Sequence, residues 1–365
     1  KKGVCGIDRI TQIDTTEFQV KIAGEVKDYQ PEDYLDKKEA KRMDRYTQFA
    51  MIAAKEAFAD SGLKMEQEDP LRCGTIVSAG IGGLKTIESE HDRGLSRGFE
   101  RISPFFIPMS IANMAAGQIA IETGFKGVCT CVVTACASGN NAIGEAFHYV
   151  RDGYSDVMLC GGAEACICNM GVGGFTAMKA LNTTEDVNRA SIPFDKERSG
   201  FVMGEGAAIL ILEELEHAKA RGARIYAEVI GYGATGDAYH ITSPAEDGKG
   251  AAMAMTLAMQ EGGIKPSQVD YINAHGTGTH HNDLFETRAI KLAFGDAAKD
   301  VVINSTKSMT GHLLGAAGGV EFIICVKSIQ DGFIHQTVGT KEVDPECDLN
   351  YAVGAPVEKD VNYVL

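Results

Sequence analysis

Two stretches of the sequence align without gaps: TACASGNNAIGEAFHYVR at residues 134–151 and TGHLLGAAGGVEFIICVK at residues 310–327. The alignment sets Cys136 opposite His312, and each stretch follows an apolar segment that is typical of a strand. A strand, a turn and a helix that recur in the same order indicate a duplicated architecture. We therefore expect His312 to begin its own helix and to point toward the same centre as Cys136.

A second pair of segments repeats the same order more loosely. Residues 61–83 and residues 262–279 each run from a helix end through a loop and a strand to a run of glycines. Both members of each pair lie in the same order along the chain. The sequence therefore predicts two halves related by an approximate twofold axis.

The two repeated helices are almost free of charge. Among Asp, Glu, Lys and Arg, residues 136–150 contain Glu145 alone, and residues 312–326 contain Glu321 alone. A helix that is apolar on nearly all sides needs cover on both faces. We therefore expect a central helical layer between two sheets, with more amphipathic helices outside, which gives a five-layer α-β-α-β-α sandwich of the α/β class.

The rest of the chain alternates strands with helices and contains no low-complexity linker. We expect an N-terminal half over residues 1–225 and a C-terminal half over residues 226–365 that pack directly on each other. The predicted strands cover residues 73–80, 127–134, 155–163, 206–214, 225–233, 269–274 and 301–306, and the clearest predicted helices cover residues 45–62 and 251–263.

Composition excludes several classes of function. The chain has 365 residues with 35 basic and 50 acidic side chains, for a formal net charge of −15. Such a charge opposes general attraction to nucleic acid or to anionic lipid. The sequence contains neither a long uninterrupted apolar run nor a leader-like segment at its start, so we expect a cytoplasmic protein without a membrane partner.

Ten cysteines raise the question of a metal site. Cys129 and Cys131, like Cys166 and Cys168, form C-x-C pairs, which leaves zinc or iron–sulfur binding open. Neither pair has the C-x₂-C spacing usual in zinc knuckles, and the alternation around Cys129 places both of its members on one strand face. Core packing without a metal is the favoured interpretation.

Cys136 differs from the other cysteines in its surroundings. It follows a β-forming run and precedes a helix of small residues, so helical N–H groups should favour its thiolate. His275 precedes a Gly-Thr-Gly-Thr turn, and Lys307 lies shortly before His312. One thiol, two imidazoles and an ammonium suit acyl transfer to sulfur, followed by decarboxylation of a malonyl thioester whose oxyanion accepts hydrogen bonds from neutral imidazoles. His280 and His281 are expected to be exposed.

Five motifs resemble those of one family. They are TACASG, GGAEA, FDKERSGFVMGEGA, NAHGTGT and STKSMTGHLLGAAGGVE, and together they resemble the β-ketoacyl-acyl-carrier-protein synthases, most closely the elongating type II enzymes. The resemblance covers nearly the whole chain and implies the thiolase fold and a homodimer. It also implies a catalytic triad of Cys136, His275 and His312, supported by an ion pair between Lys307 and Glu286.

The resemblance implies further roles. Ile81 and Phe175 match positions that line the acyl pocket, although either could be ordinary core, and Thr277 and Thr279 match substrate-binding positions. Substrates would arrive on carrier-protein phosphopantetheine, with no resident cofactor. The expected docking patch for an acidic acyl carrier protein comprises Lys37, Lys38, Lys41, Arg42 and Arg45, for which a solvated helix face is the simpler alternative.

The chain also departs from the family pattern, and other classes remain open. Family members carry an additional first strand and a final glycine-rich loop that this sequence lacks, so we expect an excerpt of a longer protein. The alternatives are a ketosynthase or a non-catalytic chain-length subunit of a type II polyketide system, a cysteine-rich metal protein, and a nicotinamide enzyme. The last is disfavoured because GIGGLK lacks the G-x-G-x-x-G spacing.

Overall fold

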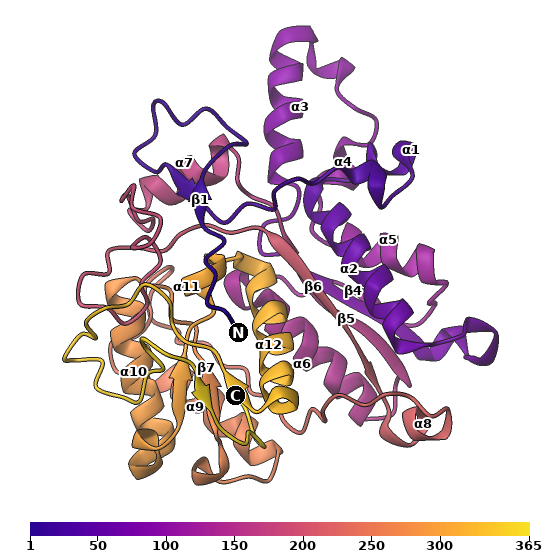
Figure 1. The fold of residues 1–365 in the computed structure, drawn as a ribbon. Helices are drawn as coiled ribbons and strands as arrows, with labels where there is room; N and C mark the ends of the chain where they lie inside the picture. The colour runs from indigo at the N-terminus through magenta and orange to yellow at the C-terminus, as the bar shows by residue number, and fades with distance from the viewer.

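The computed structural model describes residues 1–365 as two sheets with helices between and outside them (Figure 1). The first sheet has the order β4-β3-β5-β6, in which β3 is parallel to β4 and β5, and β6 is antiparallel to β5. Its strands are β3 (Cys73–Ser78), β4 (Cys129–Thr130), β5 (Val157–Glu164) and β6 (Gly206–Glu213).

The second sheet is built around two short parallel strands, β7 (Tyr271–Asn273) and β8 (Val302–Asn304). Single bridges continue it on both sides, from Tyr271 to Val364 and from Ile303 to Tyr351. Two small antiparallel pairs complete the strands, namely β1 (Asp8–Arg9) with β2 (Ile22–Ala23) and β9 (Phe333–Ile334) with β10 (Val357–Glu358).

The helices are α1 (Lys37–Ala40), α2 (Arg45–Ser61), α3 (Leu84–Arg97), α4 (Phe106–Ser110), α5 (Met114–Thr123), α6 (Ser138–Arg151), α7 (Asn169–Ala177), α8 (Leu215–Ala220), α9 (Lys249–Glu261), α10 (His280–Phe294), α11 (Lys307–Thr310) and α12 (Ala317–Asp331). The predicted helix at residues 45–62 is α2. It begins because the Asp44 side chain accepts the Tyr46 N–H, and it ends at Gly62, whose φ of 65° is left-handed.

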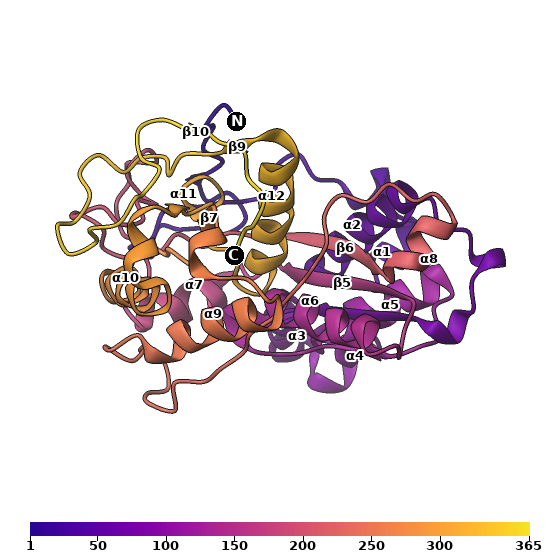
Figure 2. The same ribbon diagram turned by 90° about the horizontal axis from the view of Figure 1, so that it is seen from below.

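Helices α6 and α12 lie side by side between the two sheets (Figures 1 and 2). Ile143 of α6 packs in a buried cluster with Met158 of the first sheet. On α12, Phe322 packs against that same cluster, whereas Cys325 packs with Tyr271 of the second sheet. The central helical layer is therefore confirmed, because the side chains of α12 contact both sheets.

Amphipathic helices cover the outer faces. Helices α2 and α5 pack on the first sheet, and α9 and α10 supply Met259 and Ile290 to the cluster beneath the second sheet. The resulting order of layers is α2 with α5, the first sheet, α6 with α12, the second sheet, and α9 with α10. This is the predicted five-layer α-β-α-β-α sandwich of the thiolase fold.

Two of the strand predictions were wrong in extent or kind. Residues 225–233 form no strand, and the Tyr232 ring instead covers α6 at Gly144, where a Cβ would lie 2.2 Å from the ring. The strand predicted over residues 127–134 shrinks to the two residues of β4. Since β4 is an edge strand, hydrogen bonds hold it on one side only.

Candidate active site

Two turns at the centre of the molecule have nearly the same backbone. A 3₁₀ turn over Ala135–Ala137 leads into α6, and a second over Leu314–Ala316 leads into α12. Each begins at a left-handed residue other than glycine, with φ of 52° at Ala135 and 50° at Leu314. Leu314 is therefore the counterpart of Ala135, and Gly315 is the counterpart of Cys136.

The predicted equivalence of Cys136 with His312 was thus wrong, although the duplication itself is present. His312 does not begin a helix; it precedes the second turn. Its backbone N–H donates to the Val202 carbonyl at 2.6 Å, and its carbonyl accepts the Gly204 N–H at 2.8 Å. Gap-free alignment matched residue types in the two halves, but the chain reaches its second turn later than the alignment implies.

Glycines let the two helix ends meet at the pseudo-twofold axis. A Cβ on Gly139 would lie 3.1 Å from the Gly319 nitrogen, and a Cβ on Gly318 would lie 2.8 Å from the Asn140 nitrogen. These two contacts are related by the turn equivalence described above. Only residues without a Cβ permit this approach, which brings the Cys136 turn against the Leu314 turn.

Cys136 occupies the first of the two turns at the N-terminal end of α6. The Ser138 hydroxyl braces this turn, because it donates to the Ala135 carbonyl at 2.6 Å and accepts the Thr134 N–H at 2.9 Å. The Cys136 side chain is partly exposed and packs against a cluster that includes Phe201 and Leu314. The nucleophile position therefore borders residues from both halves.

Opposing effects act on the pKa of the Cys136 thiol: burial has the largest effect, whereas a backbone N–H lowers the pKa, as expected at a helix end. Burial raises the pKa of the Cys136 thiol, and the positive charge of Lys307 opposes this rise only in part. Desolvation of the sulfur outweighs the stabilisation of its anion. The resting group is therefore a thiol, and acylation requires the loss of its proton.

His312 has a defined tautomer. The Leu314 N–H donates to His312 Nδ1 at 3.2 Å, so the proton of the neutral ring is assigned to Nε2. The side chain is 2% exposed, and its ring centroid lies 5.2 Å from that of Phe201. His312 Nε2 is left as a hydrogen-bond donor toward a ligand.

His275 stands beside His312. Their ring centroids are 5.2 Å apart, and the rings meet edge to face at 87°. Burial, and then the charge of Lys307, lowers the pKa of His275 to about 3 and that of His312 well below its ordinary value. Both imidazoles are therefore neutral near pH 7, as an oxyanion site made of neutral donors requires.

The ammonium of Lys307 pairs with a residue that sequence reasoning did not assign to the site. Lys307 Nζ donates to Glu321 Oε1 at 2.5 Å, with the lysine side chain 1% exposed. The predicted ion pair with Glu286 was wrong, because the Glu286 carboxylate accepts the backbone N–H groups of His275 at 2.6 Å and Gly276 at 2.8 Å. Burial raises the pKa of Glu286 to about 7. The signal for Glu321 was its isolated charge in an apolar helix.

The residues predicted to contact substrate fall in different settings. Phe175 stacks edge to face on Phe201 at 5.4 Å and belongs to the same cluster as Cys136, whereas Ile81 is 38% exposed. The Thr277 and Thr279 hydroxyls lie 2.9 Å apart and are hydrogen-bonded to each other. His280 and His281 are exposed, as predicted.

The predicted docking patch is exposed except at one residue. Lys37, Lys38, Lys41 and Arg42 are exposed on and just after α1. Arg45 was wrongly included, because its guanidinium bonds the buried Glu205 carboxylate at 2.7 Å and lies 4.7 Å from the Phe49 ring.

The C-x-C cysteines do not share one environment. Cys166 and Cys168 are buried, in agreement with core packing, but Cys129 is exposed on the edge strand β4. All ten cysteines are free thiols, and no group of three or more metal-ligating side chains is present. None of the helices combines the length and the apolar character that a membrane span requires.

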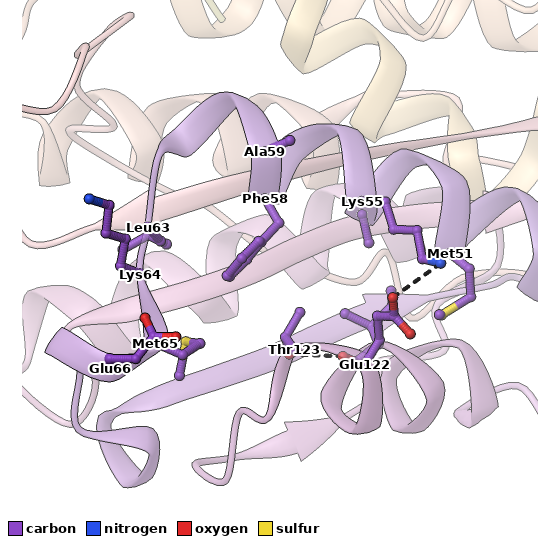
Figure 3. Close-up of a pocket in the computed structure, with 12 residues that line it drawn as sticks. Met51, Lys55, Phe58, Ala59, Leu63, Lys64, Met65, Glu66, Glu122 and Thr123 are labelled. Atoms are coloured by element: carbon purple, nitrogen blue, oxygen red, sulfur yellow. Dashed lines mark hydrogen bonds and ion pairs between the residues drawn. The ribbon is translucent and has the colours of Figure 1, made fainter. Parts of the chain in front are cut away.

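A hollow of about 410 Å³ lies between α2 and α5, and none of the candidate site residues lines it (Figure 3). Phe58 and Met65 line it, and the Lys55–Glu122 ion pair of 3.1 Å closes one end. Because α2 and α5 cover the outer face of the first sheet, that sheet separates the hollow from Cys136. The hollow therefore plays no part in the site.

The duplicated fold, with a thiol, two neutral imidazoles and an ammonium gathered where the halves meet, is typical of acyltransferases of the thiolase fold. Comparison with known proteins then identifies the family. The model of the β-ketoacyl synthase N-terminal domain matches residues 1–218, and that of the C-terminal domain matches residues 226–341. The chain belongs to the β-ketoacyl synthase family.

The relatives and solved structures agree with this assignment. The chain is 51% identical to the 3-oxoacyl-[acyl-carrier-protein] synthase 2 of Staphylococcus aureus, over 100% of this chain and 90% of the relative. The ishigamide ketosynthase/chain length factor superposes with a TM-score of 0.91 at 38% identity, over 99% of this chain and 88% of that one. A type II polyketide ketosynthase in complex with its acyl-carrier protein gives 0.89 at 34%, with the same coverage.

Proposed function

We propose that this chain catalyses the decarboxylative condensation of an acyl thioester with malonyl-carrier protein in fatty acid chain elongation, with Cys136 as nucleophile and His275 and His312 as oxyanion donors. The observation that carries the proposal is the edge-to-face pair of neutral imidazoles, 5.2 Å apart, beside the Cys136 turn. Such a chain is an acyltransferase of the 3-oxoacyl-[acyl-carrier-protein] synthase class.

In the first half-reaction, the Cys136 sulfur attacks the acyl carbonyl. The new S–C bond replaces the thioester bond to the carrier, and the thiol proton ends on the departing phosphopantetheine thiol. Burial raises the pKa of the Cys136 thiol, so the sulfur must lose its proton as it attacks.

In the second half-reaction, malonyl-carrier protein loses CO₂ as its C–C bond breaks. Negative charge moves to the thioester oxygen, where the Nε2–H of His312 and an N–H of His275 would donate to it. The resulting carbanion attacks the acyl carbonyl on Cys136, which yields the β-ketoacyl product and a thiolate that takes a proton from solvent. Burial is the main cause that lowers the pKa of both imidazoles, and the buried positive charge of Lys307 lowers it further.

Sequence identity favours fatty acid synthesis over the polyketide alternative. The match to a 3-oxoacyl-[acyl-carrier-protein] synthase 2 is 51% identical, whereas the polyketide ketosynthase structures are 38% and 34% identical. A chain-length subunit without catalysis is disfavoured because the chain has the thiol and both imidazoles. The two histidine rings adjoin each other, and Phe201, which contacts His312, belongs to the cluster against which Cys136 packs.

The proposed partners are an acyl carrier protein and a second copy of the chain, in the cytoplasm, with no resident cofactor. A solved ketosynthase complex with its carrier protein supports the first partner, and the exposed cations at Lys37, Lys38, Lys41 and Arg42 suit an acidic surface. For the homodimer, support comes from the open edge of β4 and from Val133, which is 56% exposed beside it.

The test is to incubate the protein with an acyl-carrier protein and to locate the adduct by peptide mass spectrometry. A thioester on Cys136, followed by CO₂ release and chain elongation when malonyl-carrier protein is added, is the expected result. Acylation at another cysteine, or CO₂ release that survives C136A together with H312A, would contradict the assignment.

A further inference from the structure

One buried carboxylate at the centre of the molecule has no part in the proposed chemistry. Glu164 ends β5 and is 0% exposed. A buried charge is costly unless hydrogen bonds compensate it. Glu164 has such bonds from both halves of the molecule, which makes its position informative.

The two carboxylate oxygens of Glu164 divide their donors. Oε2 accepts the Gly80 N–H at 2.7 Å and the Gly315 N–H at 3.1 Å, and so joins the loop after β3 to the turn before α12. Oε1 accepts the N–H groups of Ile81 and Gly82, each at 3.3 Å, and lies 3.3 Å from the Cys166 sulfur.

The same contacts reach both parts of the candidate site. Gly315 directly follows Leu314, whose N–H donates to His312 Nδ1 at 3.2 Å. On the other side, a Cβ on Gly80 would lie 2.8 Å from Glu164 Oε2 and 3.1 Å from the Ala135 carbonyl, immediately before Cys136. Glu164 therefore fixes the turn that orients His312 and adjoins the turn that carries the nucleophile.

We propose that Glu164 is a positioning residue, which ties the His312 turn to the Cys136 turn and so sets the distance between oxyanion donor and nucleophile. The proposal rests on the role of His312 given under the proposed function. Two consecutive backbone amides connect Glu164 to His312. The Leu314 N–H donates to the imidazole, and the neighbouring Gly315 N–H donates to Glu164, which holds this part of the turn in place. Misplacement of a reacting group by about 1 Å can cost about 100-fold in rate, which is the effect at stake.

Gly315 is the natural partner for this carboxylate. A Cβ at Gly315 would lie 2.2 Å from the Gly80 nitrogen and 2.9 Å from Glu164 Oε2, so any larger residue would separate the loop from the turn. Burial raises the pKa of Glu164, and the hydrogen bonds from Cys166, Gly315 and Gly80 oppose that rise.

Two variants disrupt the tie from opposite sides. E164Q preserves the shape of the side chain, but its NH₂ group must replace one of the two oxygens and so faces N–H donors that it cannot accept from. G315A keeps the carboxylate but forces the turn away from it. For both we expect kcat of malonyl decarboxylation to fall about 10- to 100-fold, with KM for malonyl-carrier protein changed less than about threefold. The double variant should lose little more than the worse single variant, because both break one contact.

D270N is the matched control. Asp270 also accepts two backbone N–H groups, from Asn362 at 2.8 Å and Tyr363 at 3.2 Å, but it lies before β7, at the end of that strand remote from His275. We expect D270N to lower thermal stability and to leave kcat per folded molecule unchanged. A purely structural Glu164 would behave in the same way, so normal decarboxylation by folded E164Q and G315A would overturn the proposal.

Failure of the proposed function would look different. If wild-type protein and H312A released CO₂ at equal rates, the role of His312 itself would be wrong, whatever Glu164 does. If either variant fails to fold, E164D, which shortens the side chain by one CH₂, should give an intermediate loss of kcat, and unchanged kcat in folded E164D would likewise reject the proposal.

Discussion

The turns at Cys136 and Gly315 have the same backbone conformation but different roles. Both start at a left-handed residue, Ala135 or Leu314, and both lead through a 3₁₀ turn into a central helix. The first presents a sulfur, and the second presents a glycine whose N–H bonds Glu164. The duplicated fold gives both turns the same backbone, but their side chains differ. The first turn carries a reactive thiol, whereas the second needs a glycine so that the two turns can approach closely.

The largest expected effect comes from the turn that carries the thiol. C136A should lower condensation by about 10⁴-fold or more, since no acyl-enzyme forms without the sulfur. Steady-state assay with acyl- and malonyl-carrier protein measures this, and thermal unfolding checks that the fold persists. Condensation within about tenfold of wild type would show that the thiol turn is no more reactive than its counterpart.

Loss of the buried ammonium should be the next largest effect. K307M leaves the Glu321 carboxylate unpaired, and we expect the free energy of unfolding to fall by about 3–5 kcal/mol. Chemical denaturation measures this value. The double variant K307M/E321L should recover most of the loss; an equal loss in both would mean that the pair itself does not matter.

Removal of the imidazole before the second turn should cost less. H312A should slow malonyl decarboxylation about 100- to 1000-fold, because one preorganised oxyanion donor is lost. CO₂ release measures this rate, while acylation of Cys136 by an acyl-carrier protein should be affected far less. An equal fall in the rates of acylation and decarboxylation would mean that His312 also acts in acyl transfer, and that the two turns do not serve separate half-reactions.

A smaller effect is expected where the N-terminal ends of α6 and α12 meet. G318A places a Cβ 2.3 Å from Asn140 Oδ1 and should destabilise the protein by about 1–3 kcal/mol. G174A is the control, since Gly174 lies in α7 with nothing within 4 Å of its Cβ, and should stabilise by about 0.5–1 kcal/mol. Thermal melts of both variants test whether tight approach at the axis is required.

The last prediction concerns the pH dependence of stability. Glu286 has a folded pKa of about 7, above its ordinary 4.5, so its contribution to stability is complete below pH 4.5 and is lost as pH rises through 7. The difference in unfolding free energy between wild type and E286Q should decline over that window, by no more than about 1.4 kcal/mol per pH unit. A flat difference would mean that the Glu286 carboxyl titrates at its ordinary value.

Most of the scaffold could be predicted from the sequence because it depends on local patterns. Apolar runs predicted the long strands β3, β5 and β6, and the lack of charge in α6 and α12 predicted their burial between sheets. The strand predicted over residues 225–233 was wrong because the residue pattern suits a strand, but a strand also needs a neighbouring strand to pair with. The assignment of Arg45 to the docking patch was wrong because the sequence shows its charge but does not show that it pairs with the buried Glu205, which is distant in sequence.

Residue types and motif order, read from the sequence alone, determined the family and the five layers, and they singled out Cys136, His275, His312 and Lys307 as the candidate site residues. Only the tertiary structure decided that Gly315, and not His312, is the counterpart of Cys136, that Lys307 pairs with Glu321, and that burial raises the pKa of the Cys136 thiol. The physical reason is that identity is a local property of the chain, whereas register, pairing and desolvation depend on which distant segments the fold brings together.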